Sequence, residues 1–184
     1  MTFRQMPVTT LRLILALLYS IATCTIASAE NGAEAWLRYA TLDAQTAKTF
    51  ADLPGQIVVR GNSLVVHSAE QELIRGLDHM LARSFQSSEK VGGTAIVIGV
   101  IGDLQAEAPS LRLPHPLQND GYWLTTARIR SCKCLVITAA NDRGVLYGVF
   151  ALLSKIARGE SIAKLDELQE PYAPIRWVNQ WDNL

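Results

Sequence analysis

Two closely spaced cysteines are the first residues of this 184-residue chain whose types and spacing could do chemistry. Cys132 and Cys134 are separated by one residue, so the pair could act as a redox couple or bind a metal ion. A metal site needs several ligands, and no second Cys or His pair follows at ligand spacing. The three histidines, His67, His79 and His115, are dispersed along the chain. The spacing therefore favours a structural role for the cysteines, and we predict no cofactor.

Neighbouring carboxylates are the second candidate for chemistry, because a pair of acids can divide the roles of general acid and general base. They stand at Glu70 and Glu72, at Asp166 and Glu167, and at Glu170. The surrounding stretches are polar and offer no apolar pocket that would raise a pKa. We interpret these acids as surface residues.

Arg143 is the third candidate, because it follows Asn141, a residue type that often caps a helix N-terminus. An arginine there can help a helix N-terminus to bind an anion, or it can pair with a nearby acid. The second reading is favoured. The sequence also lacks the glycine patterns that bind nucleotides and the G-x-S-x-G pattern of serine hydrolases.

The first 29 residues have the pattern of a secretory signal peptide. Arg4 and Arg12 provide the basic lead, residues 11–26 are almost wholly apolar, and Ala27-Ser28-Ala29 has the form of a cleavage site. We therefore expect cleavage after Ala29 and export to the periplasm or the medium.

The size and charge of the remaining chain limit its function. Removal of the signal leaves about 155 residues, enough for one domain but short of the roughly 250 of a complete (β/α)8 barrel. Its net charge is about −2, so the sequence predicts no binding of nucleic acid or of an anionic membrane. No later apolar run reaches about 18 residues, which predicts no membrane span.

The elements that would position these residues begin with β-branched runs at 57–59 and 64–66. The turn-forming residues 60–63 lie between them, so the pattern predicts a hairpin. Ser68 and Gln71 have the spacing of a capping box, and apolar residues at helical spacing follow as far as Phe85. Residues 95–101 are continuously apolar, as expected for a strand at the centre of a sheet.

The second half of the sequence predicts a long surface loop over 103–120 that ends in Asn119-Asp120-Gly121. A hairpin of strands at 122–128 and 133–139 is expected to follow it. The clearest element is a helix that Asn141 caps and Gly159 ends. Its apolar stripe is wide, and Gly144 and Gly148 permit a close backbone approach. This favours packing on its own sheet and on a partner outside the chain.

These elements predict an α+β fold: a two-layer structure whose sheet is mixed or largely antiparallel, with helices on a face. Residues 171–184 add a strand pattern that begins after Pro171 and Pro174 and stops without a cap or a polar tail. We divide the chain into a signal peptide (1–29), one domain (30–170), and a linker with the first strand of a further domain (171–184).

Four motifs make the chain resemble a family of glycosidases. They are Glu34-Ala35-Trp36-Leu37-Arg38-Tyr39, Asn119-Asp120-Gly121-Tyr122, the helix start at 141–153, and P-I-R-W-V-N-Q-W-D-N at 174–183. Together they resemble the N-terminal region of the xylan-degrading α-glucuronidases, glycoside hydrolase family 67. The resemblance covers essentially the whole mature chain. It implies an accessory domain followed by entry into a catalytic (β/α)8 barrel.

The resemblance also implies a function and a site. The family removes α-1,2-linked glucuronic acid, or its 4-O-methyl ether, from xylo-oligosaccharides, and it places the tryptophan of N-Q-W-D-N at the sugar. This role carries over to Trp181, where an indole face can cover a sugar ring while Asp182 and Asn183 bond to hydroxyls. The alternative is that Trp177 and Trp181 are core residues of a first barrel strand.

The barrel and its catalytic acids are absent from this sequence, so the resemblance implies an N-terminal fragment that is inactive alone. The expected partner is the catalytic barrel of the full-length enzyme, with xylo-oligosaccharide bound through that enzyme. The alternative function is a non-catalytic exported module that binds carbohydrate or a protein partner.

Overall fold

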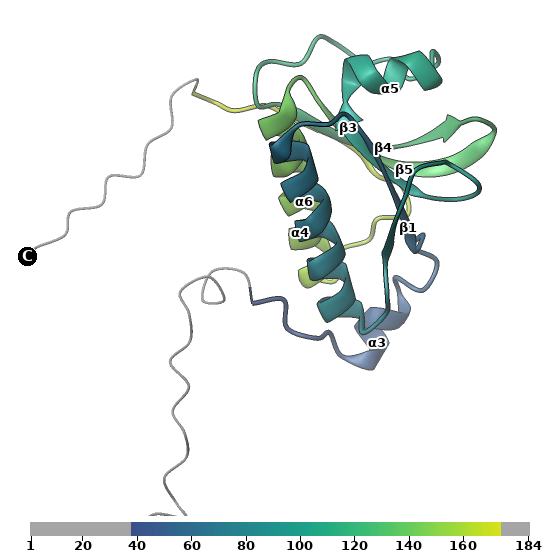
Figure 1. Cartoon of the computed structure of the whole chain (residues 1–184). Helices are drawn as coiled ribbons and strands as arrows, with labels where there is room; N and C mark the ends of the chain where they lie inside the picture. The colour runs from purple at the N-terminus through teal and green to yellow at the C-terminus, as the bar shows by residue number, and fades with distance from the viewer. Residues whose placement is uncertain (1–37, 174–184) are drawn as a thin grey trace, which may run out of the picture. The chain divides into compact units, whose positions relative to one another are not determined.

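A computed structural model describes residues 38–173, which from Tyr39 onward belong to one compact unit (Figure 1). The helices are α3 (Ala44–Lys48), α4 (Leu64–Leu81), α5 (Ile101–Glu107) and α6 (Asp142–Ala157). The strands are β1 (Gln56–Arg60), β2 (Gln86–Ser88), β3 (Ile96–Val100), β4 (Tyr122–Ile129), β5 (Cys132–Ala139) and β6 (Asp166–Gln169). No helix within this range is long and apolar enough to cross a membrane.

The strands form one mixed sheet in the order β2-β1-β3-β5-β4-β6. Strands β2, β1, β3 and β5 are parallel, whereas β4 and β6 run antiparallel to their neighbours. The predicted mixed sheet with helices is confirmed, but the largely antiparallel form is wrong. Strand β3 lies inside the sheet and is buried on both faces, as its apolar run predicts.

The predicted hairpin of β4 and β5 is also confirmed, with Tyr122 opposite Ala139 and Ile129 opposite Cys132. Arg130 and Ser131 connect the strands, and both have positive φ angles, of 47° and 71°. A two-residue loop with this backbone matches the right-handed twist of the flanking strands.

Helices α4 and α6 lie side by side over one face of the sheet (Figure 1). Their buried residues join alternate residues of the strands, such as Ile57, Ile98 and Ile137, in one apolar core. The wide stripe of α6 is therefore explained by α4: a Cβ on Gly76 of α4 would lie 2.7 Å from Leu153. The expected packing of α6 on its own sheet is confirmed, and the expectation of a further partner outside the chain stays a prediction.

The start of α4 corrects the hairpin predicted for residues 57–66. Strand β1 is present, but Leu64-Val65-Val66 forms the first turn of a helix instead of a second strand. The Ser63 hydroxyl accepts a hydrogen bond from the Val66 amide at 3.1 Å and so caps the helix. Ser68 is not a cap, because it lies inside α4 and donates to the Leu64 carbonyl. The helix ends at Leu81, before the predicted end at Phe85.

The opposite face of the sheet has a cover that the sequence does not predict. Residues 103–120 are only partly a loop, because α5 begins directly after β3 and buries Leu104. Ala108 and Leu111 come next and are also buried, against the alternate residues of the strands, among them Val97 and Val136. The predicted two layers are thus extended by a short third one.

Two edge strands were not predicted. Strand β2 pairs with β1, and β6 pairs with β4 through Tyr122 opposite Gln169. Of the predicted linker and barrel strand at 171–184, the structure describes Pro171–Ala173 of the linker; the predicted strand lies outside the described residues, as does most of the motif at 34–39.

Candidate functional site

The predicted sugar-binding residues Trp181, Asp182 and Asn183 lie outside the described residues, and so does Trp177. The described part of the chain offers two other places with functional geometry. One is a cluster of polar side chains at the carboxyl ends of the parallel strands, and the other is a pocket at their amino ends.

The polar cluster is centred on Asp120, which is 8% exposed. Its Oδ1 accepts hydrogen bonds from Nδ2 of Asn141 and from Nε of Arg143, both at 3.0 Å. Asp120 has a φ of 66° in a turn that the Gly121 amide closes onto the Gln118 carbonyl at 3.0 Å. The turn motif at 119–122 and the helix motif at 141–153 are thus in direct contact.

Asn141 connects this cluster to the start of α6. Its side-chain oxygen accepts from the Gly144 amide at 2.9 Å, so one side chain both caps the helix and bonds to Asp120. Gly144 is required because a Cβ there would lie 2.6 Å from the Gly121 carbonyl oxygen and 2.7 Å from Ala139. The close approach predicted from the glycines is confirmed.

The role of the polar cluster is structural. Arg143 forms the predicted ion pair with a buried acid, and Asp120 is engaged by two donors. Three of the four residues of the N-D-R-G sequence therefore have a structural role: Asn141 caps the helix, Arg143 holds the preceding turn, and Gly144 leaves room for the carbonyl of that turn. The cluster holds the start of α6 against the turn before β4.

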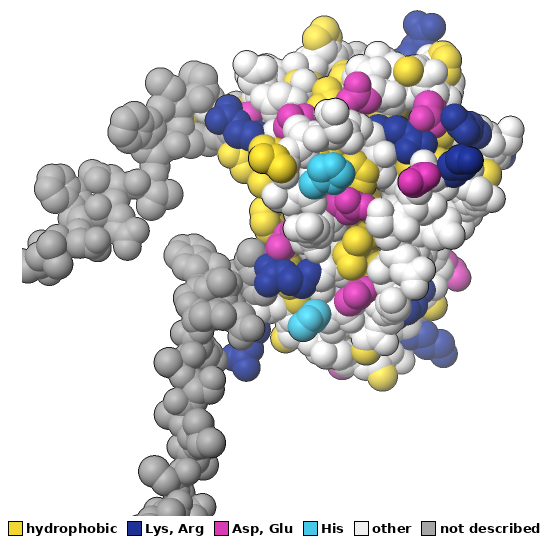
Figure 2. Space-filling view, in the orientation of Figure 1, with side chains coloured by type: hydrophobic (Ala, Val, Ile, Leu, Met, Phe, Trp, Pro, Cys, Tyr) yellow, Lys and Arg dark blue, Asp and Glu magenta, His cyan; other side chains and the backbone are white. Residues whose placement is uncertain are grey.

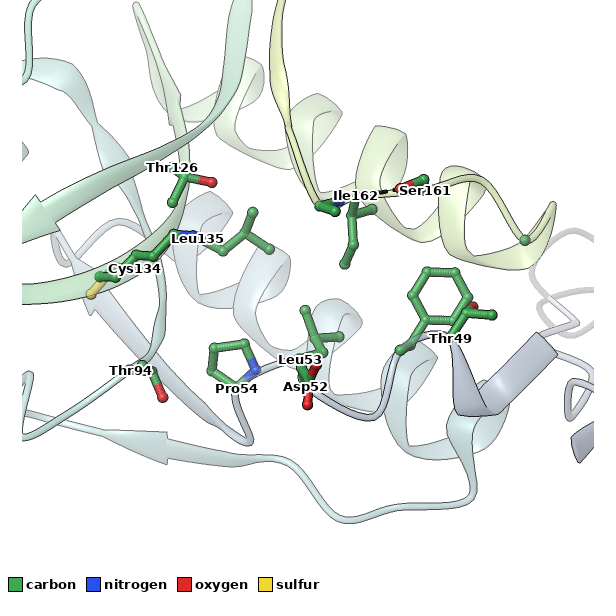
Figure 3. Close-up of a pocket in the computed structure, with 14 residues that line it drawn as sticks. Thr49, Asp52, Leu53, Pro54, Thr94, Thr126, Cys134, Leu135, Ser161 and Ile162 are labelled. Atoms are coloured by element: carbon green, nitrogen blue, oxygen red, sulfur yellow. Dashed lines mark hydrogen bonds between the residues drawn. The ribbon is translucent and has the colours of Figure 1, made fainter. Parts of the chain in front are cut away.

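The pocket at the amino ends has a volume of about 560 Å³ (Figure 3). It lies between the segment before β1, the first residues of β5 and the segment after α6. Apolar side chains form much of its lining: Phe50, Leu53, Pro54, Leu135 and Ile162. Hydroxyl groups accompany them, from Thr49, Thr94, Thr126 and Ser161.

The charged residues that line this pocket are Asp52 and Lys133. Hydrolysis of a glycosidic bond by the usual mechanism needs two carboxyl groups on opposite sides of the bond. The residues that line this pocket include a single carboxylate, so it can hold a small amphipathic molecule but lacks the groups for that reaction. No sequence motif indicated this pocket, because its residues come from five separate segments.

The two cysteines share a face of β5 near the same edge, and both are free. Burial raises the pKa of the Cys134 thiol, which keeps it protonated and weakly nucleophilic at neutral pH. Its sulfur points away from the other labelled side chains of the pocket (Figure 3). Within residues 38–173, no three His, Cys, Asp or Glu residues are grouped so that they could hold a metal ion.

One carboxylate prediction is wrong. Glu70 is only 9% exposed, and its Oε1 accepts from the Ser87 hydroxyl at 2.5 Å, so the residue joins α4 to β2 and does not belong to the surface. His67 lies 3.5 Å from the other oxygen of Glu70. Glu167 is half-buried and pairs with Lys155 at 2.6 Å. The Ser87–Glu70 and Lys155–Glu167 contacts connect elements of the fold, the His67–Glu70 contact lies within α4, and none of these residues lines the pocket.

Within residues 38–173 the chain forms an α/β domain whose pocket is lined by a single carboxylate. Comparison with known proteins then gives its family. Residues 35–152 match the N-terminus of glycosyl hydrolase family 67, and the chain belongs to this family.

Curated relatives agree with this assignment. The chain is 37% identical over 175 residues to "Probable alpha-glucuronidase A" of Aspergillus fumigatus. This alignment covers 93% of this chain and 20% of the fungal protein. It is 35% identical over 176 residues to the alpha-glucuronidase of Hypocrea jecorina, with coverages of 91% and 20%. The chain therefore spans about a fifth of the length of the relatives it matches.

A solved structure is more distantly similar. A family GH115 4-O-methyl-alpha-glucuronidase with specificity for decorated arabinogalactans superposes with a TM-score of 0.47 and 19% identity. The superposition covers 64% of this chain and 18% of that one, which is too loose to carry a functional argument.

Proposed function

We propose that this chain is the N-terminal domain of an α-glucuronidase that removes α-1,2-linked glucuronic acid, or its 4-O-methyl ether, from xylo-oligosaccharides during xylan breakdown. The observation that carries the proposal is the family match over residues 35–152, together with the alignment to α-glucuronidases over 93% of the chain. The domain supports a catalytic (β/α)8 barrel encoded by the remaining four-fifths of such a protein.

The sugar contact comes from the end of the chain in this proposal. Trp181 covers one face of the glucuronic acid ring, and Asp182 and Asn183 bond to its hydroxyls. Catalysis needs a protonated acid at the leaving oxygen and a second carboxylate that activates water. The barrel supplies both, so this chain alone releases no glucuronic acid.

A chimeric enzyme tests the proposal. This chain, from residue 30 to residue 184, replaces the matching fifth of the Hypocrea jecorina alpha-glucuronidase, and release of glucuronic acid from aldouronic xylo-oligosaccharides is measured. We expect activity from the chimera and none from either piece alone. The Trp181→Ala chimera controls for the sugar contact, and we expect its activity to fall at least about tenfold.

Two results would contradict the proposal. One is an inactive chimera beside an active parent enzyme. The other is release of glucuronic acid by this chain alone that disappears when one of its own acids is replaced. A Trp181→Ala chimera with full activity would remove only the assigned sugar contact.

Export is part of the proposal and has a separate test. The small residues Ala27 and Ala29 fit a signal peptidase site, so the secreted protein begins at Glu30. N-terminal sequencing of the protein recovered outside the cytoplasm checks this directly. Exported protein that retains Met1 would contradict it.

A further inference from the structure

We propose that the carboxyl edge of the sheet is the surface on which the rest of the full-length enzyme packs, an inference that rests on the function proposed above. The exit surface, as we call it, consists of Leu64, Tyr147 and Tyr172. Its occupant is the folded polypeptide that continues after residue 173 in the complete protein.

Exposed apolar side chains mark this surface. Within residues 38–173, the large hydrophobic side chains that are exposed are Leu64 at 85%, Tyr147 at 38% and Tyr172 at 107%. An exposed apolar residue by itself needs no explanation, but several at one place indicate an interaction site.

The topology brings all three residues to one edge. Leu64 is the first residue of α4, which comes after the carboxyl end of β1, and Tyr147 lies in the second turn of α6, which comes after β5. Because β1 and β5 point the same way in the sheet, both helices begin at the same edge (Figure 1). Hydrophobic side chains are visible where α4 and α6 begin, at the upper left of Figure 2.

Tyr172 reaches the same edge by a different route. Gln169, the last residue of β6, lies opposite Tyr122, which in turn lies opposite Ala139 at the carboxyl end of β5. One residue further, Glu170 accepts a hydrogen bond from the Gln118 amide at 2.7 Å. The chain is therefore held at this edge just before Tyr172.

The described residues consequently end at this edge of the sheet, at residue 173. The relatives are about five times as long as the matched region, so their remaining polypeptide is large enough for an interdomain contact of roughly 600–1,500 Å². Within the described residues, the opposite edge of the sheet has neither exposed large apolar side chains nor the end of the described chain. The large apolar side chains that line its pocket are buried or half-buried, and the described chain does not end there.

The test uses the active chimera with two charges on the exit surface, Leu64→Asp and Tyr172→Asp. Asp is favourable in the first turn of a helix and Tyr172 is fully exposed, so neither change should unfold the domain. We expect the double variant to lose at least about tenfold of the chimera's activity at the temperature where the unsubstituted chimera is half inactivated. Its domains should also become cleavable by protease near the junction.

The matched control places the same two charges at the opposite edge, on the exposed residues Ala51 and Ala163. This Ala51→Asp, Ala163→Asp chimera should keep its activity and protease resistance. Urea unfolding of the isolated chain with Leu64→Asp and Tyr172→Asp should match that of the unsubstituted chain, which ties the loss in the chimera to docking.

Equal activity and equal protease resistance of the two double-variant chimeras would overturn the inference about the exit surface. The proposed function would be unaffected. Dimerisation of the isolated chain that Leu64→Asp and Tyr172→Asp abolish would assign the surface to a second copy, and would overturn it too. Inactivity of the unsubstituted chimera would instead remove the proposed function and, with it, this inference.

Discussion

On one face of the sheet lie two long helices, whereas the other face is covered by one short helix and the loop after it. Helices α4 and α6 have 18 and 16 residues, and each buries seven of them. Helix α5 has seven residues, buries only Leu104, and its N-terminus has no side-chain cap. The second cover therefore has much less apolar packing than the first.

Polar contacts hold the second cover in place near both of its ends. At the end of α5, Glu107 pairs with Arg60 of β1 through two hydrogen bonds, of 2.5 Å and 3.0 Å. At the end of the loop, Asp120 is held by Asn141 and Arg143. Between them, Ala108 and Leu111 supply the buried apolar surface. The comparison shows that a segment whose apolar residues follow no regular spacing can still be held on the sheet when charged side chains anchor its ends.

The first prediction contrasts two helix glycines on the two faces and has the largest expected effect. Gly144→Ala should lower the free energy of unfolding by about 2–3 kcal/mol, because its Cβ would lie 2.6 Å from a backbone oxygen that cannot move cheaply. Gly102→Ala in α5 meets nothing within 4 Å and should be neutral or stabilising by up to about 1 kcal/mol.

Urea unfolding of both variants measures the contrast. Similar stabilities for Gly144→Ala and Gly102→Ala would show that α6 does not approach the sheet as closely as described. The interpretation of the N-D-R-G motif as a packing device would then fail.

The second prediction weakens the anchor at the end of the loop. Asp120→Asn keeps a residue type that tolerates the positive φ but removes the charge that Arg143 pairs with. We expect a loss of about 1.5–2 kcal/mol in the free energy of unfolding, at the lower end of the roughly 1.5–3 kcal/mol for hydrogen bonds to charged groups, because the Arg143 side chain is exposed.

Asp52→Asn is the matched control, because Asp52 is exposed at the opposite edge of the sheet and should tolerate the change within about 0.5 kcal/mol. Equal losses for Asp52→Asn and Asp120→Asn would remove the special role given to the polar cluster.

The parts of the fold that could be predicted from the sequence are those with strong local signals. The helix that Asn141 caps was predicted with its start and its close-packed glycines, because cap, period and terminator agree over 16 residues. Strand β3 and the β4–β5 hairpin were predicted from apolar runs and a short turn. These elements carry their own local signals.

The errors fall where local signals conflict or are too short, and where distant residues make the deciding contacts. Leu64-Val65-Val66 has strand propensity, yet Ser63 caps a helix there and Val66 packs in the core. Helix α5 is too short for a period to show, and its anchor Glu107 contacts residue 60, far away in sequence. The pocket gathers residues from five segments, and no local pattern marks such a site.

The third prediction concerns the other anchor and is the smallest. The hydrogen bond from Arg60 is the main cause that lowers the pKa of Glu107 below its ordinary value of 4.5. A folded-state pKa below the unfolded one stabilises the fold above the unfolded value, and this contribution is lost as the pH falls through the folded value. Glu107 is partly exposed, so Glu107→Gln should cost only about 1 kcal/mol at pH 7.

This cost should shrink as the pH falls below about 4.5, because protonation of Glu107 in the unsubstituted chain removes the same charge. Urea unfolding at a series of pH values between 7 and 3 measures the difference. Glu89→Gln is the control, since Glu89 is exposed and only its backbone carbonyl contacts Arg60. If the cost of Glu107→Gln were the same at pH 3 as at pH 7, packing of the side chain, and not its charge, would anchor α5.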